Sequence, residues 1–393
     1  MKAASVVSLL VASVALMLGV AMAQQAVAAR DTTVRVPVPL IPRAAEAPRV
    51  PRVPRVPKTS GAQRRSSASK CNGYSELCDR KLNLVAFPTT HNSFASGDNI
   101  AANQNKGIPD QLDDGIRGFM LDLHNASSST LFRRASASEP YLCHTSCVLL
   151  NDGPLSDTLK YFTTFLEAHS EEVISIFLEN DDNFSATTIA RAFEDAGLDK
   201  FVYTPSGSST NYTWPTLGEM VEKNTRLVVL VDRNSDTKSV PWLVYDRNYV
   251  VQTPYTVGVG STFDCSLMTD AQPLLVMNHF VYTNYSVLSM EVEKPSPDTA
   301  SSVNTRQSIV DQANVCGAAA RFPNFVTVDF YDVGDLFKAV ADINKVQYSS
   351  PSVSTDFSSA ASDSHTTSAA SLSAATGPTA VLAIAASALV LLL

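Results

Sequence analysis

The sequence predicts an α/β protein, a (β/α)8 barrel of the TIM type. Residues 71–348 form a stretch of about 280 residues, which is the usual size of one such barrel. Short apolar runs typical of strands alternate there with helical patterns, and this alternation predicts a parallel sheet. Several of these runs end in an acid, a base or an amide. Because active sites of such barrels lie at the carboxyl ends of the strands, these polar residues are the candidates for chemistry.

The expected strands are short and rich in apolar residues. They are Leu82–Phe87, Gly118–Leu123, Tyr141–Cys143, Val173–Leu178, Leu227–Val231, Tyr249–Thr253, Leu274–Asn278 and Phe325–Phe330. The helical patterns between them are Leu155–His169, Ala186–Ala196, Thr216–Lys223, Ser302–Ala319 and Gly334–Asn344. A doubly wound open sheet is the alternative fold, but no glycine-rich nucleotide-binding turn follows the first strand.

The chain begins with two segments that we expect to lie outside the barrel. Residues 1–23 have a basic start, an apolar stretch and a small-residue cleavage site, which indicates a secretory signal peptide. An N-terminal membrane anchor is the alternative, for which the stretch is short. Residues 24–70 are rich in Pro and Arg and predict a disordered linker or propeptide. This segment is basic, whereas the net charge of the whole chain is −8, so the barrel is acidic and no nucleic-acid partner is expected.

The chain ends with the order of features that signals a GPI anchor. Residues 349–376 form a spacer rich in Ser, Thr and Ala, and residues 377–393 form a short hydrophobic tail with no basic residue after it. A transmembrane helix would be longer and would usually be followed by basic residues. We therefore expect a secreted, extracellular protein that is GPI-anchored to the cell surface.

The cysteine count agrees with export. Six cysteines on a secretory route suggest three disulfides, for which fifteen pairings exist. Proximity in sequence favours Cys71–Cys78 and Cys143–Cys147, which leaves Cys265–Cys316. A metal site is the alternative, but the chain has no CxxC pair. Four glycosylation sequons point the same way, at Asn125, Asn183, Asn211 and Asn284.

Two histidines follow strand-like runs. His91 follows the first run and His144 the third, so both imidazoles are placed where a barrel holds a general base and a general acid. Asn92, Asp122 and Glu179 carry hard oxygen atoms that suit Ca²⁺ or Mg²⁺. The alternative is that these groups form hydrogen bonds or salt bridges that orient the histidines.

Four motifs in this order resemble a known family. Thr90-His91-Asn92-Ser93, Gly115-Ile116-Arg117 with Leu121-Asp122, Cys143-His144-Thr145 and Leu178-Glu179-Asn180 are similar to the X region of phosphatidylinositol-specific phospholipases C and of secreted PLC-like phosphodiesterases of fungi and other microbial eukaryotes. The resemblance implies a barrel of the PLC-like phosphodiesterase type. It also implies that His91 is the base that deprotonates the inositol 2-hydroxyl and that His144 is the acid that protonates the leaving diacylglycerol oxygen, through a cyclic phosphodiester.

The resemblance bears on the metal as well. In calcium-dependent members the metal ligands match Asn92, Asp122 and Glu179 here, whereas Met120 stands where a second acid is expected. Metal-independent bacterial members place an Arg near the Asp122 position, and this chain has none there. Ca²⁺ is therefore the expected cofactor.

Further charged residues are candidates for supporting roles. Arg117 and Arg233 are the candidate substrate-binding residues; Arg233 follows the fifth strand and would bind phosphate or a ring hydroxyl, with a surface salt bridge as the alternative. His279 and Asp329 would orient a catalytic histidine or serve the structure.

The leading hypothesis is a phosphoric diester hydrolase that cleaves a phosphoinositide-like lipid, phosphatidylinositol or GPI, at a membrane surface. A glycerophosphodiester or sphingomyelin-type substrate is the neighbouring alternative. A catalytically silent, surface-anchored binding barrel is the alternative of another class, which Met120 favours and the two histidines oppose.

Overall fold

The computed structural model describes residues 68–126, 139–144, 146–205, 212–267, 273–287, 290–351 and 353–361. The predicted signal peptide, most of the Pro/Arg-rich segment and the hydrophobic tail lie outside the described residues.

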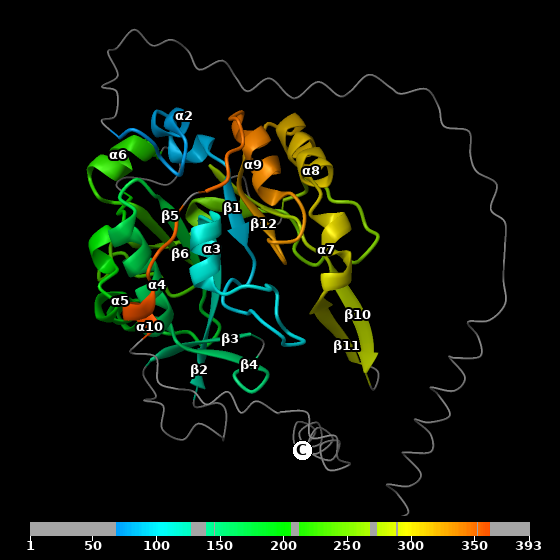
Figure 1. Ribbon diagram of the computed structural model, residues 1–393. Helices are drawn as coiled ribbons and strands as arrows, with labels where there is room; N and C mark the ends of the chain where they lie inside the picture. Colours follow the sequence, from blue (N-terminus) through cyan, green and yellow to red (C-terminus); the bar gives the residue numbers. More distant parts are fainter. Residues whose placement is uncertain are drawn as a thin grey trace, which may run out of the picture. The chain divides into compact units, whose positions relative to one another are not determined.

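Eight parallel strands form the centre of the fold (Figure 1). They are β1 (Phe87–Thr90), β2 (Gly118–Asn125), β5 (Ile174–Glu179), β6 (Leu227–Val231), β7 (Leu243–Tyr245), β8 (Val250–Gln252), β9 (Leu274–Asn278) and β12 (Pro323–Val328), in the spatial order β7-β6-β5-β2-β1-β12-β9-β8. The two outermost strands, β7 and β8, are joined in sequence by the 3-10 turn η5 (Asp246–Asn248). The predicted α/β class and TIM-type barrel are confirmed.

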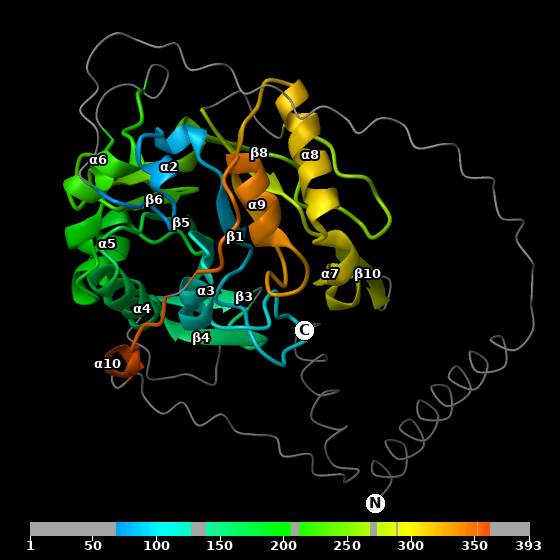
Figure 2. The same cartoon turned by 45° about the horizontal axis from the view of Figure 1, so that its top comes forward.

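Helices cover the outside of this sheet (Figures 1 and 2). They are α3 (Ile108–Asp114), α4 (Leu155–Ala168), α5 (Ala186–Asp195), α6 (Leu217–Glu222), α7 (Pro297–Val303), α8 (Arg306–Ala318) and α9 (Leu336–Asn344), with shorter turns at α2 (Ser75–Cys78), η1 (Leu82–Leu84), η3 (Asp199–Phe201) and α10 (Ser358–Ala361). Local sequence explains several starts. Ser185 caps α5, and Thr216 with Glu219 forms a capping box on α6.

The strands bury both faces because side chains alternate between the barrel interior and the helical layer. The interior cluster holds Phe87, Met120, Phe177 and Phe325, and the Phe177 and Phe325 rings meet edge to face at 4.8 Å. The residues between them, such as Phe119 on β2, belong to the outer cluster with the helices. Asp122 and Glu179 stand two residues after Met120 and Phe177, so alternation turns them toward the barrel interior as well. They are partners in register at the ends of β2 and β5, which places both at the mouth of the barrel.

Two expected strands differ from the structure. The first begins at Phe87 instead of Leu82, because the backbone of Leu82 donates to Pro215 O and that of Ala86 to the Asn344 side chain, so this run is tied to loops and helices and not to the sheet. The third, Tyr141–Cys143, lies in β3 (Pro140–His144), which pairs antiparallel with β2 and with β4 (Leu150–Pro154). The eighth barrel position belongs to the short strand β7, which the sequence did not predict.

Antiparallel extensions project from the carboxyl end of the barrel. In Figure 1 the β2–β3–β4 extension lies below the arrowhead of β1, and the hairpin of β10 (Tyr282–Val287) and β11 (Met290–Pro295) projects from the same end. Both extensions thus flank the region where barrel chemistry is expected.

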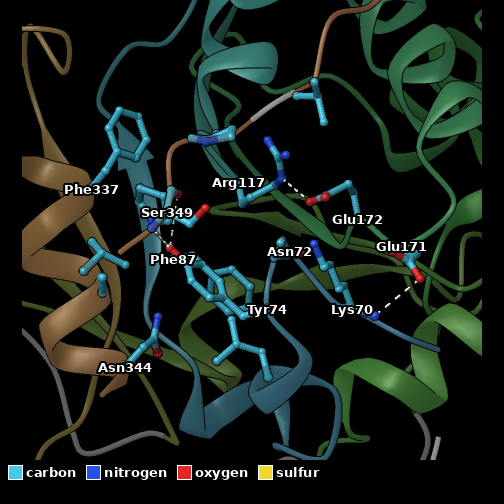
Figure 3. A pocket seen from close by; sticks show the side chains of 18 of the residues that line it. Lys70, Asn72, Tyr74, Phe87, Arg117, Glu171, Glu172, Phe337, Asn344 and Ser349 are labelled. Atoms are coloured by element: carbon cyan, nitrogen blue, oxygen red, sulfur yellow. Dashed lines mark hydrogen bonds and ion pairs between the residues drawn. The ribbon is translucent and has the colours of Figure 1, made fainter. Parts of the chain in front are cut away.

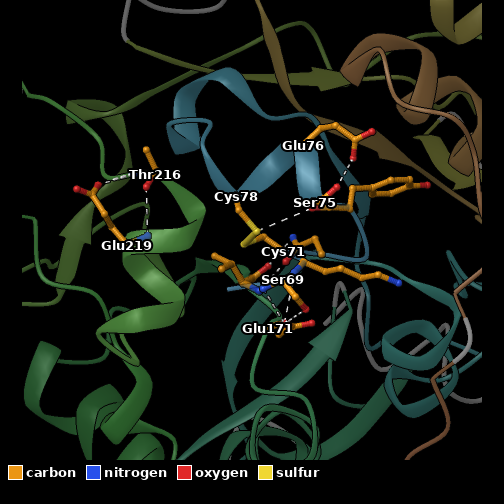
Figure 4. Close-up of a disulfide and its surroundings, with 12 residues drawn as sticks. Ser69, Cys71, Ser75, Glu76, Cys78, Glu171, Thr216 and Glu219 are labelled. Carbon is orange, nitrogen blue, oxygen red and sulfur yellow. Dashed lines mark hydrogen bonds between the residues drawn. A yellow bond between two sulfur atoms is a disulfide. The ribbon is translucent and has the colours of Figure 1, made fainter. Parts of the chain in front are cut away.

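All three predicted disulfides are confirmed: Cys71–Cys78, Cys143–Cys147 and Cys265–Cys316. Figure 4 shows the first of them at the amino end of the barrel, near the capped start of α6. There Glu171 accepts hydrogen bonds from Ser69, which ties the first described residues to the barrel.

The folded unit extends into the predicted spacer. Thr355 donates to the Asp113 carboxylate at 2.6 and 3.0 Å and contacts His169 at 2.9 Å, and Phe357 packs on the core. None of the helices in the described part of the chain is long and apolar enough to cross a membrane.

Candidate functional site

Polar side chains from four strands meet at the carboxyl end of the barrel. His91 and Asn92 follow β1, and Asp329 follows β12, which is the neighbour of β1. Asp122 on β2 and Glu179 on β5 are direct partners in the register of these two strands. The four strands are contiguous in the sheet, so one mouth holds all five residues.

A chain of polar contacts connects the two histidines. His91 Nδ1 lies 2.9 Å from Asp329 Oδ1, and the Asn103 amide donates to the same oxygen at 3.1 Å. Asn103 Oδ1 in turn accepts from the Asn92 amide at 3.2 Å. At the other end of the chain, Asn92 Nδ2 lies 3.0 Å from His144 Nδ1. The structure therefore brings His91 and His144 to the two sides of one small polar cluster.

Each histidine has its own carboxylate. His144 Nδ1 lies 3.3 Å from Asp122 Oδ2, as His91 Nδ1 lies beside Asp329. A carboxylate at Nδ1 favours the tautomer with the proton on that nitrogen, so Nε2 is left for the substrate. The two imidazoles thus have the same arrangement, on opposite sides of Asn92.

The backbone after β1 is held in place from three directions. Asn92 has a positive φ of 42°, a conformation that Asn adopts more easily than most residues. The Ser93 hydroxyl accepts from Met120 N, and the Gln104 amide donates to His91 O at 2.8 Å and to Val328 O at 3.1 Å. The turn that carries His91 is thus attached to β2 through Ser93 and to β12 through Gln104.

His91 is packed on an aromatic ring and sits among acids. Its imidazole stacks on Phe280 with the ring centroids 4.2 Å apart. Burial lowers the pKa of His91, but the charge and hydrogen bond of Asp329, together with Asp122 and Glu179, outweigh it, so the pKa is raised. The surrounding carboxylates favour the protonated imidazole, which is the form that must exist after a base has taken a proton.

Asp122 and Glu179 form a pair of like charges. The pKa of the Glu179 carboxyl is raised, first by burial among protein atoms and then by the negative charge of Asp122. Its side chain is nevertheless exposed to solvent. Because water still reaches this carboxylate, holding it in the charged form costs less free energy than it would for an enclosed acid.

The Asn92 amide connects this pair to the histidines. It lies between Asp122, whose two oxygens are 3.1 and 3.3 Å from one end of the amide, and Asn103 and His144 at the other end. Turned with its nitrogen toward Asp122, the Asn92 amide donates to both Asp122 oxygens, and its oxygen accepts from His144 Nδ1. The Asp122 and Glu179 carboxyls supply hard oxygens for a cation, and a cation would also relieve the repulsion between them. Among the described residues no group of three or more His, Cys, Asp and Glu side chains is arranged to hold a metal ion, so the Asn92 oxygen would have to serve as a ligand.

Met120 forms the apolar floor beneath these groups. It is 8% exposed and belongs to the interior cluster, one alternation step below Asp122 on β2. A thioether supplies no hard oxygen ligand, so the position expected to hold a second acid contributes packing instead.

Arg233 lies at the mouth but is already paired. Its guanidinium contacts Asp232 at 2.6 and 2.7 Å and Asp181 at 3.6 Å, and 43% of its side chain is exposed. The salt bridge considered from the sequence is therefore present. A contact between Arg233 and substrate stays a prediction.

Arg117 is a correction to the sequence-based prediction. It precedes β2, five residues or about 16 Å from Asp122 along the strand, and therefore lies at the amino end of the barrel. There it is buried, pairs with Glu172 at 2.7 Å and packs on the Phe165 ring. It neither contacts substrate held by the histidines nor orients them.

A cavity of about 390 Å³ also lies at the amino end, away from the histidines (Figure 3). Arg117 and Glu172 line it, together with Tyr74, Phe337 and Ser349. The guanidinium and carboxylate that face it already pair with each other. We therefore place the candidate chemistry at the carboxyl end, where two histidines and the facing Asp122 and Glu179 carboxyls gather.

Sequence reasoning missed two members of the site. Asn103 comes from the loop that returns after β1, and no pattern in the sequence marks it. Phe280 follows β9 and was not considered as a support for His91. Asp329 was predicted to lie in the eighth strand as a possible histidine partner; the structure places it directly after β12, beside His91. His279, by contrast, is fully buried and bonds Gln312 and Val303 O, so it serves the structure.

Comparisons with known proteins identify relatives of this chain. The family model PI-PLC X 1 matches residues 77–344. A PI-PLC X domain-containing protein 1 of Arthroderma benhamiae is 30% identical over 282 residues, covering 70% of this chain and 89% of that protein. An uncharacterized secreted protein of the same fungus is 28% identical over 309 residues, covering 74% of this chain and 67% of that protein. A PI-PLC X domain-containing protein of Arabidopsis thaliana is 26% identical over 289 residues, and this alignment covers 67% of this chain and 62% of that protein.

Solved structures are more distant. The phosphatidylinositol-specific phospholipase C of Listeria monocytogenes superposes with a TM-score of 0.45 at 15% identity, covering 70% of this chain and 98% of that enzyme. A variant of the Staphylococcus aureus enzyme gives 0.45 at 14% identity, covering 68% and 94%. The match of the family model over most of the barrel establishes that this chain belongs to the PI-PLC X domain family.

Proposed function

We propose that this protein is a phosphoric diester hydrolase that cleaves a phosphoinositide-like lipid, phosphatidylinositol or a GPI anchor. The observation that carries the proposal is the polar cluster in which two histidines, each beside its own carboxylate, flank a single amide. A base and an acid held on two sides of one small site suit the transfer of a phosphoryl group from one oxygen to another.

His91 is the proposed base. With Nδ1 protonated and held by Asp329, its Nε2 takes the proton of the substrate's 2-hydroxyl. The hydroxyl oxygen then bonds to phosphorus. Asp329 stabilises the imidazolium that forms, as the raised pKa of His91 indicates. Phe280 keeps the ring in its plane.

His144 is the proposed acid. Its Nδ1 lies beside Asp122, and its Nε2 gives a proton to the departing diacylglycerol oxygen as the bond from phosphorus to that oxygen breaks. The product is a cyclic phosphodiester and a neutral alcohol. Water then opens the ring with the roles reversed, since His144 now takes a proton and His91 returns one.

We further propose that Ca²⁺ is held by Asn92, Asp122 and Glu179. When bound, the ion supplies positive charge for the phosphate oxygens. The facing carboxyls of Asp122 and Glu179 and the raised pKa of Glu179 support this assignment, because a cation would relieve the repulsion between them.

The place of action is proposed from the ends of the chain. The signal peptide and the C-terminal signal predict a secreted protein that is GPI-anchored at the cell surface, facing membrane lipids. A relative in Arthroderma benhamiae carries the description of a secreted protein, which supports export.

A panel of diesters tests the substrate. The purified protein is incubated with phosphatidylinositol vesicles, with lysophosphatidylcholine and with glycerophosphoinositol, in Ca²⁺ or in EDTA. We expect turnover of phosphatidylinositol and a loss of rate in EDTA. Preference for lysophosphatidylcholine would move the assignment to a sphingomyelin-type diesterase. No turnover of any diester would favour a silent binding barrel.

A further inference from the structure

The two histidines of the site are held in different ways. His91 directly follows β1, a strand with a neighbour on each side in the barrel, and its ring stacks on Phe280. His144 is the last residue of β3, which belongs to an antiparallel extension outside the barrel (Figure 1). In the described part of the chain, the polar contacts of its ring are those of Nδ1 with Asn92 and Asp122. The proposed acid therefore lies outside the packing that holds the proposed base.

The backbone at His144 is paired on one side. The register of β3 with β2 ends at Leu142. Cys143 and His144, the last two residues of β3, pair with Asn151 and Leu150 of β4, and the described strands offer them no second partner. The register with β4 shifts between Leu142 and Cys143, at the same point. His144 thus stands at the tip of a two-stranded ribbon, and such a ribbon is only marginally stable by itself.

The Cys143–Cys147 disulfide closes a short loop around His144. It joins the residue directly before the histidine to the residue three positions after it. Inside this loop Ser146 N donates to His144 O at 2.6 Å, and Leu150 N donates to Ser146 O, which ties the turn to β4. Both cysteines are buried, so the bridge also anchors the turn in the protein. A closed loop of this length leaves the backbone of His144 few conformations.

We propose that the Cys143–Cys147 disulfide positions the proton donor His144, so that the two cysteines are positioning residues for the departure of the alcohol. The proposal rests on the proposed function in that His144 is the acid. The bridge does for this histidine what two neighbouring strands and the Phe280 ring do for His91.

Loss of the bridge affects one step more than the others. His144 gives its Nε2 proton to the departing diacylglycerol oxygen, and a misplacement of about 1 Å in a reacting group lowers a rate by about 100-fold. A leaving oxygen that is stable as an anion needs no such proton. Without the bridge, the departure of an alcohol should therefore slow, whereas the departure of a nitrophenolate should not.

Two soluble substrates separate these cases in the full chain. Short-chain phosphatidylinositol releases an alcohol, and the nitrophenyl ester of inositol 1-phosphate releases a nitrophenolate. The double variant Cys143→Ala with Cys147→Ala removes the bridge and leaves neither of its thiols unpaired. The matched control is Cys71→Ala with Cys78→Ala, which removes another short disulfide at the amino end of the barrel. For each protein, kcat per folded molecule and KM are measured.

The two substrates should respond differently. Removal of the Cys143–Cys147 bridge should lower kcat on short-chain phosphatidylinositol by about 10- to 100-fold with little change in KM, and should lower kcat on the nitrophenyl ester by less than about twofold. The control should keep wild-type rates on both. A general structural role would lower the two rates together. An equal loss on both substrates, or no loss on phosphatidylinositol, would overturn the proposal.

A second variant keeps the buried sulfur atoms, because a protein without them can fail to fold. Two glycines inserted between Thr145 and Ser146 lengthen the bridged loop and leave both cysteines bonded. The loss should again be larger on phosphatidylinositol than on the nitrophenyl ester, and wild-type rates on both would contradict the proposal. Added to His144→Ala, the insertion should lower turnover no further, since no acid is left to position. A further loss there would show that the loop acts through other residues.

The NMR signals of the His144 ring give a readout that needs no turnover. Its imidazole carbon–proton signals, assigned with His144→Ala, should shift and broaden when the bridge is removed, while those of His91 stay in place. Unchanged His144 signals would overturn the positioning role. If the wild type cleaves neither substrate, the proposed function fails, and the spectrum still decides whether the bridge holds the His144 ring.

Discussion

The two ends of the barrel treat neighbouring charges in opposite ways. Where β2 and β5 begin, Arg117 faces Glu172 and the pair is buried at 2.7 Å. Where the same two strands end, Asp122 faces Glu179, and burial together with the charge of Asp122 raises the pKa of Glu179. Adjacent strands thus carry an opposite-charge pair at one end and a like-charge pair at the other.

The difference separates stability from function. At the amino end, buried cations find several partners; Arg226, for example, donates to Leu166 O and His169 O. At the carboxyl end, Asp329 keeps one buried oxygen without a partner among the described residues. Unpaired acids lower the stability of a fold and are tolerated where a substrate, a proton or a cation completes them.

The largest expected effect is on catalysis at the carboxyl end. His91→Ala and His144→Ala should each lower turnover of phosphatidylinositol by about 100- to 10,000-fold, because each removes one proton transfer. Initial rates and thermal unfolding are measured together, so that a loss of turnover per folded molecule is separated from a loss of folded protein. His169→Ala at the amino end is the control, with wild-type turnover. Cleavage that survives both substitutions at the mouth would refute the acid–base assignment.

The next effect is on stability at the amino end. Arg117→Met should lower the free energy of unfolding by about 3–5 kcal/mol, since it leaves Glu172 buried without a partner. Urea unfolding measures the loss. The double variant Arg117→Met with Glu172→Leu should recover part of it. Turnover per folded molecule should be unchanged, and a specific loss of turnover would return Arg117 to the active site.

A smaller effect is expected from removing the like charge. Glu179→Gln should raise the stability at neutral pH by no more than about 1 kcal/mol, because water screens this carboxylate. A carboxyl with a raised pKa destabilises the fold as pH rises above the ordinary value of 4.5, so the variant should lose that slope. Added Ca²⁺ should raise the melting temperature of the wild type and not of the variant. Equal stabilisation of both proteins by Ca²⁺ would remove Glu179 from the proposed ligands.

The smallest effect concerns His279, which is buried and neutral. Burial lowers its pKa below the ordinary 6.5, so its contribution to stability is complete above pH 6.5 and is lost as the pH falls through the folded pKa. The wild type should lose stability between pH 7 and 5 with a slope from this residue of at most about 1.4 kcal/mol per pH unit. His279→Gln should flatten the curve, and identical slopes would show that His279 does not titrate on unfolding.

Much of the fold was predictable because its signals are local. A continuous apolar run such as Leu227–Val231 predicts a strand that is buried on both faces of the sheet, as it is here. The residues that cap α6 lie at the start of that helix in the sequence. The disulfides were predictable by proximity for two pairs and by elimination for the third. The errors have non-local causes. Tyr141–Cys143 has the composition of a barrel strand, but its antiparallel pairing with β2 depends on the tertiary fold. The three residues of β7 are too few to show a period.

The candidate site was predictable where a strand end marks it. His91, Asp122 and Glu179 all stand at the end of a strand or directly after it, so the parallel sheet alone brings them together. Asn103 was not predictable, since it enters the site through a loop that folds back over β1. Arg117 belongs to a motif shared with the family, but its position directly before β2 puts it at the amino end of the barrel.

The most direct test of the account follows the phosphorus atom. Phosphatidylinositol is cleaved in water enriched in oxygen-18, and the products are followed over time by phosphorus NMR. If His91 activates the hydroxyl of the substrate itself, a cyclic phosphodiester free of the label appears first, and the open phosphate with one labelled oxygen appears later. An open, labelled phosphate as the first product would mean that water attacks directly, and it would contradict the roles assigned to the two histidines.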